Sequence, residues 1–231
     1  MSEESDGEAS GDAEGSEGAE GSEAVAEADE AEGPQGAEAA PVIEGSPGAE
    51  GTAVVGVVGD DGSVAAACRE AGAEPLAGDP QTVIDAESEA VLTVVEAALR
   101  SVALLDPSVP VLPVEAGRGV RSVPEGSVAG AVETVLAGDA SRERHPVLSV
   151  GLGDDQVARA LFDAMVVTAA PAHISEFRVT HGEEVVAQFR ADGLVAATPA
   201  GTPGYARAAG SPVVPAGPAV CAVEPIAPFA T

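Results

Sequence analysis

The sequence predicts an α/β domain followed by a mainly β domain, both preceded by a long acidic segment. Between residues 52 and 140, apolar runs of strand length alternate with helix-like stretches, which is typical of parallel βα units. From about residue 141 the apolar runs follow one another without such helical stretches, as in antiparallel sheets. We therefore expect one domain over residues 52–140 and a second over residues 141–231.

Residues 1–51 are a low-complexity segment of Glu, Gly, Ala and Ser, with 16 of the 39 acidic residues and no basic residue. Such a segment cannot bury enough apolar surface to offset the entropy lost on folding. We expect a disordered acidic tail, with order beginning near Thr52. The tail fits either an interaction arm or a solvating extension, and the second interpretation is favoured.

The chain is strongly acidic, with a formal net charge of −29, and all ten of its basic residues are arginines. Without a basic patch it is expected to bind neither nucleic acid nor an anionic membrane. The charge suits a cytoplasm at molar salt, where the screening length falls to about 3 Å; an ordinary acidic protein is the alternative. No apolar run is long enough to predict a membrane span. The cysteines and histidines are dispersed and predict no metal site.

Each domain can be divided into expected elements. In the first, Ser63 and Ser127 are expected to cap helices, and the prolines of 109–114 mark an edge strand or a strand end. The expected strands are 53–58, 90–95 and 109–114, and the expected helices are 63–72, 96–105 and 127–137. In the second domain, His181-Gly182 predicts a hairpin turn and 204–210 a short helical turn. The strands expected there are 146–150, 161–168, 174–180, 184–190, 193–197 and 219–224.

Residues 192–212 read DGLVAATPAGTPGYARAAGSP. This stretch resembles the signature of the NAD kinase family, in which a DG pair leads through a strand into a TPxGSTAY turn. Residues 160–163 (ALFD) are similar to the family's ALNE motif, with Phe162 in place of asparagine, and 110–122 resemble its VNxGxxGF loop, with Glu115 in place of asparagine. The resemblance covers about residues 53–229. It assigns nucleotide-binding roles to Asp163, Asp192, Gly193, Thr198, Gly201, Thr202 and Tyr205. For the glycines and Tyr205, simple turn and packing roles remain the alternative.

The resemblance implies an NAD kinase-like fold, shortened at its C-terminus, and phosphorylation of the NAD 2′-hydroxyl by ATP to give NADP. It also implies NAD or NADP, ATP and Mg²⁺ as ligands. A homo-oligomer, or a hetero-oligomer with an intact homologue, is the expected assembly.

One departure concerns the family's GGDG loop, whose place is taken by Val95-Glu96-Ala97-Ala98. Ala97 stands at the expected aspartate position, so no catalytic residue is assigned. Two candidates could take the place of the missing aspartate: Glu96 and the GDDG turn at 59–62. We therefore expect a weak or inactive member of the family. The alternatives are a non-catalytic nucleotide-sensing or partner-binding homologue that assembles with an active kinase, and a decayed copy.

Overall fold

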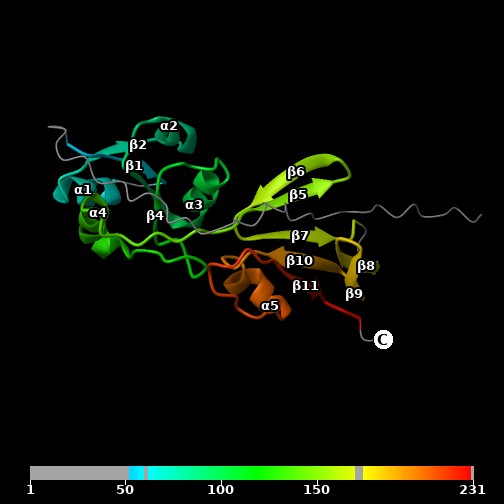
Figure 1. Cartoon of the computed structure of the whole chain (residues 1–231). Coiled ribbons are helices and arrows are strands. Elements are labelled where there is room, and N and C mark those ends of the chain that lie inside the picture. Colours follow the sequence, from blue (N-terminus) through cyan, green and yellow to red (C-terminus); the bar gives the residue numbers. More distant parts are fainter. Residues whose placement is uncertain (1–51, 60–61, 170–173, 230–231) are drawn as a thin grey trace, which may run out of the picture.

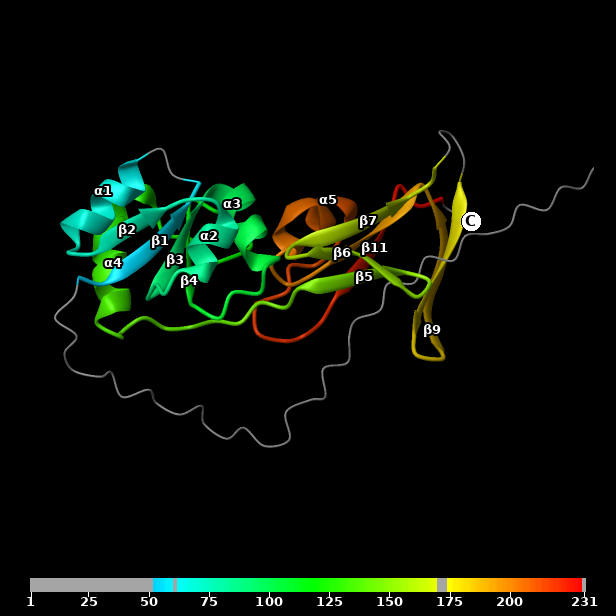
Figure 2. The same cartoon turned by 90° about the horizontal axis from the view of Figure 1, so that it is seen from above.

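The computed structural model describes residues 52–59, 62–169 and 174–229. The predictions for the acidic tail, and for the two aspartates of the GDDG turn, lie outside the described residues. An α/β region and a β region lie end to end (Figures 1 and 2). The α/β layer followed by antiparallel β-sheets confirms the predicted fold class.

The first region is a parallel sheet with helices on both faces, as the alternating pattern predicted. Its strand order is β2-β1-β3-β4, so the chain starts in the middle of the sheet and builds outward on both sides. β4 is an edge strand, as its prolines predicted. The strands are β1 (Val54–Val58), β2 (Glu74–Ala77), β3 (Ala90–Val94) and β4 (Val111–Val114), and the helices are α1 (Ser63–Glu70), α2 (Pro80–Asp85), α3 (Val95–Ala103), η1 (Glu125–Ser127) and α4 (Val128–Leu136).

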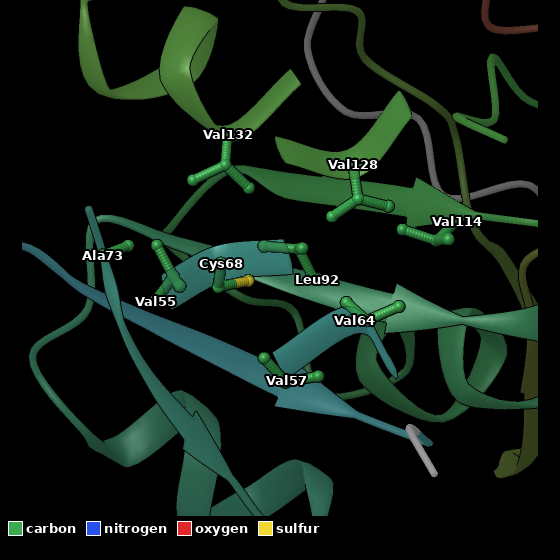
Figure 3. Close-up of a cluster of buried hydrophobic side chains, with 9 residues drawn as sticks. All are labelled: Val55, Val57, Val64, Cys68, Ala73, Leu92, Val114, Val128 and Val132. Carbon is green, nitrogen blue, oxygen red and sulfur yellow. The ribbon is translucent and has the colours of Figure 1, made fainter. Parts of the chain in front are cut away.

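The two faces of this sheet bury separate apolar clusters, because alternate side chains of each strand point to opposite faces. On one face, strand residues such as Val57 and Leu92 pack with Val64 of α1 and Val132 of α4 (Figure 3). On the other, Val91 packs with residues of α2 and α3. Valine, alanine and leucine fill these cores, as the scarcity of aromatic residues requires. The sheet is therefore fixed from both sides, and its strand ends are held in place.

The second region consists of one three-stranded sheet and two hairpins. The sheet has the order β11-β10-β7, and the hairpins are β5–β6 and β8–β9. His181 pairs with Glu184 across the turn, and Gly182 has φ +57°, which confirms the predicted hairpin. The elements are β5 (Leu148–Leu152), β6 (Asp155–Ala160), β7 (Asp163–Val167), β8 (Ser175–His181), β9 (Glu184–Ala191), β10 (Gly193–Ala197), η2 (Thr202–Ala206), α5 (Arg207–Ala209) and β11 (Ala222–Ile226).

The structure differs from the sequence-based expectations at a few short elements. The first helix has Gly62, with φ +110°, at its N-cap, and Ser63 is already helical. Ser127 does occupy the N-cap of α4, but its side chain makes no capping hydrogen bond. β2, α2 and β6 were not predicted. β2 and α2 are only 4 and 6 residues long, too short for a periodic pattern, and β6 is largely polar and exposed.

The two regions touch through a small apolar cluster, one hydrogen bond from a side chain and one close backbone approach. Leu99 of α3 and Ala116 pack against Leu161, which lies two residues before the start of β7. The Arg159 guanidinium donates a hydrogen bond to the Leu104 carbonyl at 3.0 Å. A Cβ on Gly119 would overlap the carbonyl group of Ala200. The junction therefore brings the loop after β4 against the turn after β10.

Among the helices in the described part of the chain, none is long and apolar enough to cross a membrane. Large exposed apolar side chains are concentrated in the second region, where β7 alone exposes Met165 and Val167 by 53% and 62%. β7 is also an edge of its three-stranded sheet. This edge therefore combines unpaired backbone groups with apolar side chains.

Candidate functional site

The first candidate site lies at the carboxyl ends of β1, β3 and β4. The residues that directly follow these strands are Gly59, Val95 and Glu115, and they have φ values of +84°, +62° and +50°. All three line one cavity of about 210 Å³, together with Ser63, Val94, Val114 and Glu125. β1 is followed along the chain by β2 on one side of the sheet, whereas β3 is followed by β4 on the other side. The strand order therefore reverses between β1 and β3, and open α/β sheets bind ligands at such switch points.

Val95 and the first turn of α3 directly follow β3 and form what we call the loop after β3, and this loop has an unusual backbone at Val95. A left-handed conformation is disfavoured for a β-branched residue, because its Cβ crowds the backbone. Val95 lines the cavity and is 47% exposed. Ala97, where the resemblance places the aspartate, is exposed in the first turn of α3, and its carbonyl accepts a hydrogen bond from the Ser101 hydroxyl at 2.9 Å. The side chain that the loop presents to the cavity is therefore apolar.

A second cluster forms at the turn after β10, which carries the TPAGTPGY sequence. Thr198 is fully buried, and its hydroxyl donates to the Leu161 carbonyl at 2.7 Å. The same hydroxyl oxygen accepts from the Gly201 amide at 3.2 Å. A Cβ on Gly201 would overlap the backbone of Phe162. Thr198 and Gly201 therefore fix the turn against the segment that precedes β7, and the Thr198 side chain is occupied by this structural role.

The rest of this turn is divided between buried and exposed residues. The Thr202 hydroxyl is also buried, donating to the Pro199 carbonyl at 2.9 Å and accepting from the Val214 amide at 3.0 Å. Tyr205, in contrast, is 46% exposed. Of these two predicted binding residues, only Tyr205 has a side chain open to a ligand.

Asp163 connects this turn to the first region. It is the first residue of β7 and pairs with Ala197, the last residue of β10. Burial raises the pKa of the Asp163 carboxyl, and the negative charge of Glu96 raises it further. Glu96 is in the first turn of α3, and its carboxylate lies 3.5 Å from the place where a Cβ on Gly117 would stand. The junction therefore brings together carboxylates from both regions.

The predicted pair Asp192 and Gly193 lies at the other end of β10. Five strand residues separate this end from Thr198, a span of about 16 Å. A Cβ on Gly193 would come within 2.5 Å of the Val166 carbonyl oxygen, so this glycine serves close packing in the sheet. Asp192 borders a separate, open hollow of about 410 Å³ with Ala227, Pro228 and Phe229. The structure thus places five of the seven predicted binding residues at the start of β7 and in the turn after β10, and two at the other end of β10.

The two residues that replace asparagines in the resemblance have clear structural roles. Glu115 accepts a hydrogen bond from the Glu125 amide at 3.0 Å, so its carboxylate binds the start of the η1–α4 helical segment. Phe162 is half-buried and packs on the junction cluster of Leu99, Ala116 and Leu161. Sequence reasoning missed Val95, Gly119 and Glu125 as residues of the site. A valine carries no sequence signal of a positive φ, and the contacts of the other two are long-range.

Comparison with known proteins agrees with this geometry. Residues 162–231 match the family model of the ATP-NAD kinase C-terminal domain. The chain is 32% identical over 126 residues to the NAD kinase of Methanothermobacter thermautotrophicus, covering 54% of this chain and 44% of that protein. It is 33% identical over 132 residues to the NAD kinase of Methanocorpusculum labreanum, covering 57% and 49%. The chain thus spans about half the length of these curated relatives.

Solved structures show the same fold. An NAD kinase from Archaeoglobus fulgidus in complex with ATP superposes with a TM-score of 0.60 at 19% identity, over 78% of this chain and 74% of that one. Yeast NADH kinase complexed with NADH gives a TM-score of 0.55 at 15% identity, over 78% and 64%. These likenesses show that the chain has the two-region fold of these kinases. The family model over residues 162–231 and the curated relatives support membership of the NAD kinase family.

Proposed function

We propose that this chain binds an adenine dinucleotide at the junction of its two regions and transfers phosphoryl groups weakly or not at all. The observation that carries the proposal is the loop after β3. It has a left-handed turn at Val95 beside the cavity, while the side chain presented there is apolar. The backbone turn beside the cavity is thus present, but the Val95 side chain can neither accept a proton nor carry a charge.

Binding is supported by the turn after β10. Its hydroxyls and its close glycine contact fix the backbone before any ligand arrives, so little ordering entropy is lost on binding. Tyr205 leaves an aromatic face exposed beside this fixed turn. A pocket needs shape, backbone donors and stacking surfaces to bind, and none of these requires a catalytic carboxylate.

Weak transfer is supported by the charge at the junction. Phosphoryl transfer depends on positioning and on neutralising the charge of the transferred group. The negative charge of Glu96 raises the pKa of the Asp163 carboxyl there, and Glu115 and Glu125 line the adjacent cavity. The side chains of the described residues form no group of three or more potential metal ligands. Mg²⁺ and ATP stay expectations from the family.

Calorimetry with NAD in molar KCl tests the binding proposal. We expect millimolar affinity that falls in Tyr205→Ala, because the exposed ring supplies the stacking surface. Val213→Ala is the matched control, since Val213 is also an exposed side chain, 50% accessible, just beyond the same turn. An absence of heat from the wild-type protein, or equal heat from wild type and Tyr205→Ala, would contradict the proposal.

A second candidate function is partner binding, as a nucleotide-sensing subunit that assembles with itself or with an intact homologue. The exposed apolar edge of β7 favours it, because such edges pair readily with another chain. Residues 141–231 carry nine acidic residues and six arginines, so this region repels a second acidic chain less than the rest of the chain does. Light scattering at molar salt should report an oligomer, and Met165→Lys should shift it toward monomer. A wild-type monomer would rule out self-association.

A high-salt cytoplasm and a place in NADP metabolism complete the proposal. The high-salt cytoplasm rests on the charge of −29, because only strong screening by salt makes the repulsion among so many carboxylates small in the folded chain.

A further inference from the structure

The segment between β6 and β7, residues 159–163, runs along α3 in the opposite direction. At the C-terminal end of the helix, the Arg159 guanidinium donates a hydrogen bond to the Leu104 carbonyl at 3.0 Å. Nearer the middle of the helix, Leu161 packs against Leu99. Moving from Arg159 to Leu161 thus leads back along α3 toward its first turn, which lies beside the cavity at the strand ends.

At that first turn the interaction between the two elements is repulsive. Burial raises the pKa of the Asp163 carboxyl, and the negative charge of Glu96 in the first turn raises it further. Asp163 is partly buried, where salt screens a charge less than at the surface. The four residue steps of segment 159–163 span about 13 Å when extended, and the eight helix steps between the two charged contacts span about 12 Å. Attraction at one end and repulsion at the other therefore act on the same pair of elements.

The attractive contact matches donor and charge to the end of a helix. The carbonyls of Arg100 and Val102 accept the backbone amides of Leu104 and Leu105, which follow α3. The Leu104 carbonyl instead accepts the guanidinium of Arg159 from the other region. Because the C-terminal end of a helix carries a partial negative charge, this place favours a cation.

The same segment holds the turn after β10. The Leu161 carbonyl accepts the Thr198 hydroxyl at 2.7 Å, and the Phe162 carbonyl accepts the Thr198 amide at 2.9 Å. On the other side, α3 begins at Val95, which lines the cavity. A shift of the segment along α3 would therefore move the turn after β10 relative to the cavity.

We infer that Arg159 is a positioning residue for the proposed dinucleotide site: it ties the segment before β7 to the C-terminal end of α3 and so sets the distance between the turn after β10 and the loop after β3. The inference rests on the proposed nucleotide binding and deepens it. Arg159 acts through these elements and contacts no ligand itself. Without its hydrogen bond, the repulsion between Glu96 and Asp163 opens the junction.

Calorimetry with NAD in molar KCl tests the inference on wild type and three variants. Arg159→Ala should bind NAD about fivefold more weakly, a difference of about 1 kcal/mol. Arg159→Lys keeps the charge and a donor for the Leu104 carbonyl, so its affinity should return to within about twofold of wild type. Arg178→Ala removes the same charge from an exposed position on β8 of the same region and should bind as wild type.

A second background separates positioning from a local structural role. In Glu96→Gln the repulsion at the other end of α3 is removed, so adding Arg159→Ala there should weaken NAD binding by only about twofold or less. A purely local role of Arg159 would give the same loss, about fivefold, in both backgrounds, because the two side chains act at opposite ends of the helix.

The possible failures are distinguishable. Wild-type affinity in Arg159→Ala, no recovery in Arg159→Lys, or equal losses in the two backgrounds would overturn the inference and leave nucleotide binding intact. An absence of NAD binding by the wild-type protein would overturn the proposed function, and the inference with it.

Discussion

At the scale of the residue, Val95 has a left-handed backbone conformation that a glycine would adopt more easily than a β-branched valine. A non-glycine residue in a left-handed conformation costs about 1–3 kcal/mol. The surrounding structure must hold this conformation, and Ala98 and Leu99, which are buried on the first turns of α3, anchor the segment that follows Val95.

Val95→Gly should raise the free energy of unfolding by about 1 kcal/mol, because glycine adopts φ +62° without strain and the lost side chain is half-exposed. Urea unfolding at molar salt measures the change. The matched control is Val94→Gly, at φ −93°, where the half-buried side chain packs on the core and its loss should destabilise. A Val95→Gly variant no more stable than wild type would show that the loop is not strained.

Asp163 gives a prediction with a defined pH dependence. Burial and Glu96 raise the pKa of its carboxyl in the folded protein above the ordinary value of 3.8. The folded state therefore binds the proton more readily than the unfolded state, so the stability from this group is present at low pH and is lost as pH rises through the raised pKa. At neutral pH the ionised carboxylate destabilises the fold.

Asp163→Asn should accordingly raise the melting temperature at pH 7, and the gain should shrink toward zero as the pH falls to about 4. Thermal unfolding at a series of pH values measures it. Glu96→Gln, which removes only the smaller cause, should give a smaller gain. A gain that is equal at all pH values would contradict this explanation.

At the scale of the element, the turn after β10 depends on buried hydroxyl bonds. Thr198→Val keeps the shape of the side chain but leaves the Leu161 carbonyl without this donor and the Gly201 amide without this acceptor. We expect a loss of about 1–3 kcal/mol in the free energy of unfolding. Thr134→Val, whose hydroxyl bonds a carbonyl on exposed α4, should change it by about 0.5 kcal/mol or less. Equal effects of the two substitutions would remove the structural role assigned to Thr198.

Longer elements could be predicted from the sequence, and the site could be predicted only in part. The apolar runs of β1, β3 and β10 are continuous and flanked by glycines or turns, so their pattern is unambiguous. The TPAGTPGY turn was recognisable because its spacing is local. In contrast, the separation of Asp192 from Thr198 follows from the length of β10, and the approach of Glu96 to Asp163 depends on how two regions meet. Neither relation is encoded in neighbouring residues.

Gly119 tests whether the junction is needed for binding. Gly119→Ala places a methyl group on the Ala200 carbonyl and should push the turn after β10 away from the first region. We expect NAD affinity to fall by about tenfold or more, by the loss of about 1.4 kcal/mol or more. Limited proteolysis should also become faster across the irregular segment 139–147. Gly130→Ala, where a Cβ meets no other element within 4 Å, is the control and should bind as wild type. Unchanged affinity in Gly119→Ala would show that the two regions need not meet for binding.

At the scale of the whole molecule, charge and apolar surface are distributed unequally. The acidic residues are concentrated toward the N-terminal part of the sequence, while the exposed apolar side chains gather on the β region. Strong screening by salt weakens repulsion between copies and strengthens apolar contacts, so both folding and association should be favoured under the same conditions. The proposed nucleotide site lies where the two unlike regions meet.

The central claim is that binding survives while phosphoryl transfer is weak or lost. The direct measurement is a coupled assay of NADP formation from ATP, Mg²⁺ and NAD in molar KCl, on the same preparation whose NAD binding has been measured by calorimetry. We predict measurable NAD binding with NADP formation close to the no-enzyme control, because the loop after β3 presents Val95 to the cavity and the junction is anionic. NADP formation far above that control, retained in highly purified protein, would contradict the account.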